Sequence, residues 1–141
     1  MSQQNVELVR ALTRTAGADL TGWLEAMAPE IELHLSGVFP DLDPVYRGHD
    51  GVREFAARFN ATWEELTADT YRYVDLGNRV LTLTHLRGRG RDAIEVMLEM
   101  GHVWTVRDGL IVRMDAFADP QKALEAVGLA GFASPPAEPL Q

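Results

Sequence analysis

A single histidine interrupts an apolar row in the longest run of alternating residues, 94–106. Side chains of an extended strand point alternately to its two faces, so every second residue of this run shares one face. His102 is the only titratable member of its row. Such an imidazole is either a hydrogen-bonded core histidine or an acid–base group in a pocket, because histidine titrates near neutral pH. The other members of the row are Val96, Leu98, Met100, Trp104 and Val106.

A second candidate base lies in the shorter alternating run 31–36. An imidazole there can accept a proton near neutral pH, so we name His34 as a candidate catalytic residue beside His102. Alternation places His34 on the face of Glu32 and Ser36, opposite the apolar row of the same strand. This pattern also fits a solvated or interface histidine, and both interpretations stay open.

The two remaining histidines are interpreted as structural. His85 lies near the end of another predicted strand, 80–87, where either face is compatible with a pocket. His49 directly precedes a predicted helix, and we assign it to the capping turn of that helix.

Large apolar side chains are the predicted lining of any cavity. Most of them are expected in the core, but ligand sites are also mostly apolar, with a few polar groups. Trp104 and Met114 are the preferred lining residues, since they lie on facing strands beside the row of His102. The full predicted ligand-binding set is Trp104, Met100, Met114, Phe55, Phe59, Tyr46, Trp63 and Leu86.

Composition excludes several other kinds of site. The 141 residues carry a net charge of −8, which disfavours a nucleic-acid or anionic-membrane partner. The absence of cysteine excludes disulfides, thiolate catalysis and zinc–thiolate centres. The histidines lack the tight spacing of common metal motifs, and no nucleotide-binding loop is visible, so we expect neither a metal nor a cofactor. No signal peptide or membrane-spanning run is visible, which predicts a cytoplasmic location.

The elements that position these residues are predicted from periodicity and turn signals. Two short helices open the chain, a strand follows, and a third helix begins near Asp50. An antiparallel meander comes next, and Asp119-Pro120 starts a last helix that Gly128 ends. The predicted helices span 6–13, 20–27 and 50–63, the strands 31–36, 71–76, 80–87, 94–106 and 110–117, and residues 37–48 form a loop.

Helices and strands are therefore segregated, which indicates an α+β domain and not alternating βαβ units. We predict one domain over residues 1–130. Residues 131–141 are rich in proline and alanine and are predicted to be a disordered tail.

Five segments of the chain carry a family resemblance: NVELVR at 5–10, MAPEIELH at 27–34, YRGHDGVREF at 46–55, HVWTVRDGLIVR at 102–113 and ALEAVGL at 123–129. Together they resemble the SnoaL-like branch of the NTF2-like superfamily. The resemblance implies a cone-shaped fold, with a curved antiparallel sheet packed on about three N-terminal helices and a C-terminal helix. It also implies a homodimer through the broad sheet face that carries Val103, Thr105, Ile111 and Phe117.

The resemblance assigns roles to both candidate histidines. His102 falls where ketosteroid isomerase places an acid that donates to the developing oxyanion, and His34 falls where it places its general base. Related cyclases and an epoxide hydrolase place a catalytic aspartate where this chain has Ala116. The neighbouring Asp115 is expected on the opposite face, where it can pair with Arg113.

Two kinds of function remain. One is an enzyme that performs cofactor-independent proton transfer, cyclisation or dehydration on a small apolar carbonyl compound, with His102 and His34 as acid and base. The other is a non-catalytic ligand-binding or dimeric association domain with the same pocket, and the missing aspartate at Ala116 keeps this alternative open.

Overall fold

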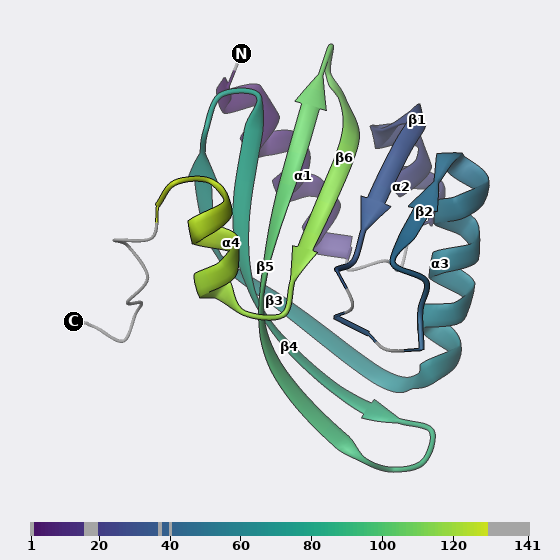
Figure 1. The fold of residues 1–141 in the computed structure, drawn as a ribbon. Helices are drawn as coiled ribbons and strands as arrows, with labels where there is room; N and C mark the ends of the chain where they lie inside the picture. The colour runs from purple at the N-terminus through teal and green to yellow at the C-terminus, as the bar shows by residue number, and fades with distance from the viewer. Residues whose placement is uncertain (1, 16–19, 37, 40, 130–141) are drawn as a thin grey trace.

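A computed structural model describes residues 2–15, 20–36, 38–39 and 41–129 (Figure 1). The predicted tail 131–141 lies outside the described residues. The helices are α1 (Ser2–Thr15), α2 (Leu20–Ala26), α3 (Gly48–Thr62) and α4 (Pro120–Ala126), and the strands are β1 (Met27–His34), β2 (Val45–Arg47), β3 (Trp63–Asp75), β4 (Arg79–Gly90), β5 (Glu95–Arg107) and β6 (Leu110–Phe117).

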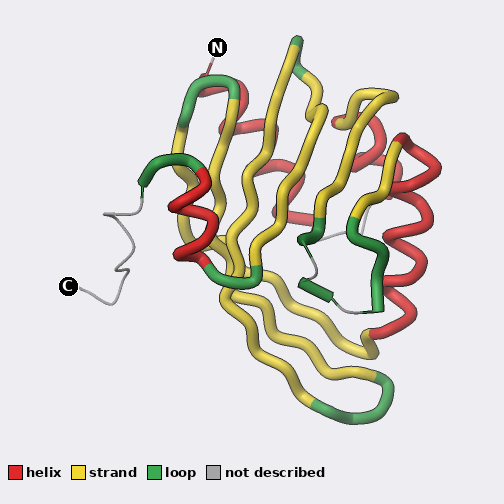
Figure 2. Tube along the Cα trace, in the orientation of Figure 1, coloured by secondary structure: helices red, strands yellow, loops and turns green. Residues whose placement is uncertain are grey.

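The strands form one curved sheet in the order β2-β1-β6-β5-β4-β3 (Figure 2). The chain from β3 to β6 is an antiparallel meander, as predicted. β1, in contrast, pairs with β6 in parallel, with Leu33 opposite Met114, so the sheet is mixed. The α+β class is confirmed, and the expectation of a purely antiparallel sheet is corrected at this one pair.

Several boundaries differ from the prediction. α3 ends at Thr62 and β3 begins at Trp63, well before the predicted start at Tyr71. The Trp63 ring at the start of β3 lies against Gly88 of β4, where a Cβ would be only 2.5 Å from the ring. A side chain at position 88 would therefore push Trp63 off the sheet. The predicted loop 37–48 also contains the short edge strand β2.

The first three helices cover the inner face of the sheet, and α4 lies on the outer face (Figure 1). Val9 of α1, Val52 of α3 and Ile31 of β1 are fully buried in the main core between the helices and the sheet. Apolar side chains from both layers thus leave water together, which is the main favourable term in folding.

α4 packs against the middle of the outer face. Its Ala123 and Leu124 are buried against Leu81, Leu83 and Val103. The helix begins as predicted, with the Asp119 carboxylate accepting a hydrogen bond from the Gln121 backbone amide at 2.9 Å. The close approach of the helix requires a glycine below it, because a Cβ on Gly101 would lie 2.4 Å from the Ala123 Cβ.

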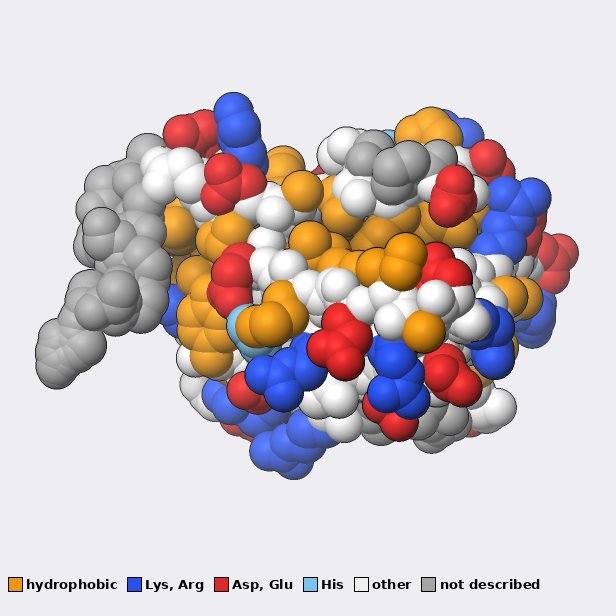
Figure 3. Space-filling model, turned by 90° about the horizontal axis from the view of Figure 1, so that it is seen from below, with side chains coloured by type: hydrophobic (Ala, Val, Ile, Leu, Met, Phe, Trp, Pro, Cys, Tyr) orange, Lys and Arg blue, Asp and Glu red, His pale blue; other side chains and the backbone are white. Residues whose placement is uncertain are grey.

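The broad sheet face that carries Val103, Thr105, Ile111 and Phe117 was predicted to be an exposed apolar surface, and this prediction is wrong. Val103 is buried and Phe117 half-buried in the cluster under α4, whereas Ile111 is buried in the main core between the first three helices and the sheet. The sequence indicated the last helix but not the face that it covers. Exposed large apolar side chains lie elsewhere, at Ile94 and Met97 near the end of the β4–β5 hairpin, and hydrophobic side chains gather in the middle of the face seen from below (Figure 3).

No helix within the described residues is both long enough and apolar enough to cross a membrane.

Candidate functional site

A cavity of about 130 Å³ lies between the inner face of the sheet and the first three helices. Strands β3 to β6 and all three helices contribute to its wall, so the site depends on the whole fold. The wall is mostly apolar, and none of the described residues that line it is Lys, Arg, Asp or Glu. The lining residues are Thr13, Leu20, Trp23, Leu35, Phe39, Val52, Phe55, Ala56, Phe59, Asn60, Leu66, Ala68, Thr70, Thr84, Leu86, Met100, His102, Trp104, Met114 and Ala116.

His102 is the only titratable residue among the described residues of this wall. Strand register places it opposite Thr82 of β4 and Ala116 of β6, in the middle of the sheet. Its Nδ1 is buried and has no hydrogen-bond partner among the described residues. Burial lowers the pKa of His102 to about 4, because the charged imidazolium would lose its hydration. The imidazole is therefore neutral at pH 7.

A hydrogen bond below the cavity wall fixes the ring next to His102. Trp104 donates from Nε1 to Oγ1 of the buried Thr82 at 2.9 Å. The Trp104 ring lies 5.8 Å from the His102 ring with a tilt of 33°, and 6.4 Å from the Trp23 ring in an edge-on arrangement. The indole is held on one side by a hydrogen bond and on two others by ring contacts, so it restricts where the imidazole can lie.

The other polar groups of the described wall are the Asn60 amide and the hydroxyls of two pairs. Thr70 of β3 and Thr84 of β4 face each other with 3.0 Å between their Oγ1 atoms. Thr13 of α1 donates to the Arg10 carbonyl oxygen at 3.1 Å and lies 2.7 Å from the Tyr73 hydroxyl, which therefore donates to Thr13. The second pair is completed by the Arg10 carbonyl, whereas one hydroxyl hydrogen of the first pair has no acceptor among the described residues.

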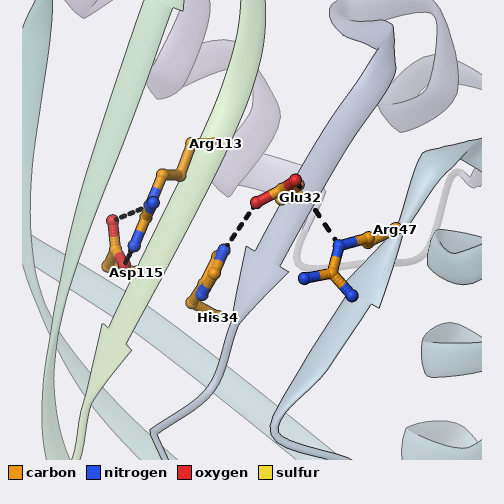
Figure 4. Close-up of polar contacts among 5 residues, drawn as sticks. All are labelled: Glu32, His34, Arg47, Arg113 and Asp115. Atoms are coloured by element: carbon orange, nitrogen blue, oxygen red, sulfur yellow. Dashed lines mark hydrogen bonds and ion pairs between the residues drawn. The ribbon is translucent and has the colours of Figure 1, made fainter.

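His34 lies outside the cavity, which corrects the predicted pairing of His34 with His102. Its Nε2 is 2.8 Å from Glu32 Oε1, and Arg47 contacts the other oxygen of the same carboxylate at 3.5 Å (Figure 4). The hydrogen bond from His34, helped by Arg47, lowers the pKa of Glu32. Strict alternation explains the placement, because the inner row of β1 is the buried set Ile31 and Leu33.

The Arg113–Asp115 pair is formed as predicted. Asp115 accepts from the Arg113 guanidinium at 2.9 to 3.1 Å, in the same region of the sheet as His34 (Figure 4). Asp115 therefore points away from the cavity, and Ala116 takes the cavity position. No group of three metal-ligating side chains occurs among the residues that the structure describes.

The two other histidines lie outside the cavity. His49 Nε2 donates to the Met27 carbonyl oxygen at 3.0 Å, which ties the start of α3 to β1. His85 pairs through Nδ1 with the Glu99 carboxylate, which also accepts from the Tyr71 hydroxyl at 3.1 Å. Burial and the bond to Glu99 raise the pKa of Tyr71 to about 12.

Most of the predicted lining residues reach the cavity, and two do not. Tyr46 is buried beside Phe55, and its hydroxyl accepts from the Asp43 backbone amide at 3.0 Å. Trp63 lies behind Phe59, with ring centroids 6.0 Å apart. Both support the wall from behind. The predicted residues that line the cavity are Trp104, Met100, Met114, Phe55, Phe59 and Leu86.

Sequence reasoning missed the polar part of the wall. Thr84 and Leu86 share one face of β4, and this alternation is the signal that was available for Thr84. Thr70 lies in a stretch of β3 that was not predicted as strand, so its face had no basis for assignment. Phe39 comes from the loop after β1, where no periodicity exists to indicate its direction.

Comparison with known proteins agrees with this architecture. The SnoaL-like domain family matches residues 7–114. An NTF2-like protein of unknown function from Burkholderia pseudomallei is 24% identical over 91% of this chain and 99% of its own, with a TM-score of 0.76. TerC, crystallised with polyporic acid, is 24% identical over 86% and 96%, with a TM-score of 0.75.

A third structure is more distant in sequence. It is a protein from Catenulispora acidiphila with a ketosteroid isomerase-like fold, in complex with trimethylamine. It is 15% identical over 92% of this chain and 98% of its own, with a TM-score of 0.69. No curated protein matches the chain. The family match covers most of the described residues, and the chain belongs to the SnoaL-like domain family.

Proposed function

We propose that this domain binds a small, largely apolar organic compound in the cavity, and that His102 orients the ligand through its carbonyl or hydroxyl oxygen. The observation that carries the proposal is a neutral imidazole whose buried Nδ1 has no hydrogen-bond partner among the described residues, on a wall whose described residues are otherwise uncharged. Ligand sites combine an apolar lining with a few placed polar groups, and this wall has that composition. The structural neighbours that were crystallised with polyporic acid and with trimethylamine support a ligand-binding use of the fold.

His102 is suited to contact an oxygen atom. A neutral imidazole has one N–H donor and one acceptor nitrogen, and a buried nitrogen without a partner costs about 1–3 kcal/mol. A ligand group or a water molecule that pairs with the ring recovers part of this cost. The Trp104 indole holds the ring in place, so the ligand meets an oriented group and not a freely rotating one.

Proton transfer is a second candidate function, favoured by the same imidazole. A neutral ring can take a proton from the carbon beside a ligand carbonyl and return it at another carbon, which balances the proton without a cofactor. The free hydroxyl hydrogen of the Thr70–Thr84 pair can donate to the oxygen that becomes negative meanwhile. The described residues of the wall offer no second titratable group, since Ala116 occupies the aspartate position and His34 lies elsewhere. We therefore place binding before catalysis.

The expected location and assembly remain part of the proposal. A cytoplasmic homodimer is the state implied by the family resemblance. α4 already covers part of the broad sheet face, so a dimer has to use the outer face beside α4. The mass of the protein in solution distinguishes a dimer from a monomer.

A matched pair of variants tests the binding function. Small ketones and alcohols on polyketide-like, steroid-like and terpenoid frames are screened by thermal shift and then by calorimetry. A ligand at about one hundred times its Kd stabilises the folded state by about 2.7 kcal/mol. We expect a compound that stabilises the wild type and His34→Phe but has lost most of its effect on His102→Phe.

Each other outcome has a defined meaning. Equal binding by His102→Phe would show that His102 does not orient the ligand. A failure of every compound to bind the wild type would count against the binding function itself. Turnover of a bound compound by the wild type and not by His102→Phe would move proton transfer to first place.

A further inference from the structure

Two groups of aromatic rings line the cavity and indicate the shape of its ligand. Phe39, Phe59 and Phe55 form a contiguous group, with centroid distances of 5.2 Å and 5.4 Å between neighbours. Trp23 and Trp104 form a second group, in which the rings lie 6.4 Å apart. Aromatic rings pack well against other flat rings, in stacked or edge-on arrangements. The wall is therefore best filled by a planar ring.

The described part of the wall carries no charge to balance a charged ligand. Its residues in the ranges 20–36, 38–39 and 41–129, together with Thr13, include no Lys, Arg, Asp or Glu, and burial holds the pKa of His102 at about 4, so the imidazole is neutral at pH 7. An ion that enters such a site loses hydration and gains no partner, which is strongly unfavourable. An uncharged ligand avoids this penalty.

The polar groups of the wall fit an oxygen substituent. In the Thr70–Thr84 pair one hydroxyl donates to the other, and the hydrogen of the second hydroxyl has no other acceptor among the described residues. Thr84 pairs with Met100 in the sheet register, and Met100 is two residues from His102 on the same strand. The free hydroxyl hydrogen and the imidazole therefore belong to one region of the sheet side of the cavity wall. A carbonyl or hydroxyl oxygen can use either group.

The size of the cavity limits the ring system. Its volume is about 130 Å³. An engineered apolar cavity of about 150 Å³ holds one benzene molecule. One six-membered ring with a short substituent therefore fits inside, whereas a fused polycyclic compound exceeds this volume and cannot be fully enclosed.

We infer that the cavity selects an uncharged, single-ring aromatic compound with one carbonyl or hydroxyl oxygen on a short substituent. The inference rests on the proposed binding function and adds three limits on the ligand, namely its charge, its ring type and its size.

Matched probes test each limit separately by calorimetry or by ligand-detected NMR. Acetophenone represents the inferred class. Benzoate and benzylammonium change the charge, 1-cyclohexylethanone removes the aromaticity, and 2-acetylnaphthalene adds a ring. We expect acetophenone to bind about tenfold or more tightly than either ion, because the ions lose uncompensated hydration. It should also bind more tightly than the cyclohexyl and naphthyl ketones.

A variant pair tests the oxygen contact. Thr84→Val keeps the shape of the side chain and removes its hydroxyl. We expect it to weaken acetophenone binding about threefold to tenfold, as for one lost hydrogen bond, and to leave the binding of ethylbenzene unchanged. Thr67→Val, on the exposed side of β3, should change neither affinity.

The outcomes separate this inference from the function on which it rests. If an ion, the cyclohexyl ketone or the naphthyl ketone binds as tightly as acetophenone, the inference is overturned and the binding function stands. If Thr84→Val leaves acetophenone binding unchanged, the oxygen contact is overturned. If larger compounds bind in a manner dependent on His102 and no single-ring probe does, the size limit is wrong. If nothing binds, both proposals fail together.

Discussion

Trp104 and Thr82 are joined by a hydrogen bond across neighbouring strands, with 2.9 Å between the indole Nε1 and the hydroxyl oxygen. Both side chains are buried, and the strand register places Thr82 directly opposite His102. The threonine thus supports the ring that packs against His102, the one titratable side chain among the described lining residues. Its contribution is measurable without any ligand.

Replacing Thr82 with valine should destabilise the fold. The variant keeps the volume of the side chain and leaves the buried indole N–H without a partner, which costs about 1–3 kcal/mol. Urea unfolding measures the change in the free energy of unfolding. Thr67→Val, at an exposed position of β3, is the matched control and should lie within about 0.5 kcal/mol of the wild type. Equal stability of the two variants would contradict the assigned hydrogen bond.

His102 should make the stability of the wild type depend on pH. Its pKa falls from 6.5 to about 4 on folding, so between these values the unfolded chain binds more protons than the folded one. Stability due to this group is therefore full above pH 6.5 and declines as the pH falls towards 4, by up to about 3 kcal/mol.

The measurement is the difference in unfolding free energy between the wild type and His102→Phe from pH 7.5 to pH 4. The carboxylates shared by both proteins cancel in this difference. His102→Gln also cannot titrate, so its difference in unfolding free energy from the wild type should change with pH in the same way. A difference that stays constant over this range would show that the imidazole is hydrated in the folded protein.

The contact between Gly101 and Ala123 predicts that substitutions at these two positions have non-additive effects on the free energy of unfolding. Gly101→Ala alone should cost about 1–3 kcal/mol, because its Cβ would overlap the Ala123 Cβ and push α4 from the sheet. Ala123→Gly alone should cost about 1 kcal/mol for a glycine inside a helix. The double variant should be more stable than the sum of the two costs predicts. Simple additivity in a double-mutant cycle would mean that α4 does not pack on Gly101.

Alternation was the most reliable guide to the site. It placed His102 and Trp104 in one row of β5, and both line the cavity. It also placed His34 beside Glu32 and away from the apolar row, where the structure has it, although the family resemblance suggested a catalytic role. A two-residue period states directly which face a side chain occupies, whereas an aligned position carries over a role only if the neighbouring groups are also present.

Long-range features escaped prediction because no local signal encodes them. The parallel pairing of β1 with β6 depends on where the chain returns after α3 and the meander, and alternation within β1 is the same for either partner. The side of the sheet that α4 covers is decided by Gly101, a single residue inside a strand. The start of α4, in contrast, follows from Asp119 and Pro120 alone and was predicted correctly.

The pairing of β1 with β6 also bears on how the protein folds. The meander from β3 to β6 can form through hairpins between consecutive strands, whereas β1 must find β6 across most of the chain. Contacts between residues far apart in sequence close large loops and slow folding. Leu35 of the cavity wall directly follows β1, so the cavity is completed only when this late contact forms. A bound ligand should then mainly lower the unfolding rate and leave the folding rate nearly unchanged.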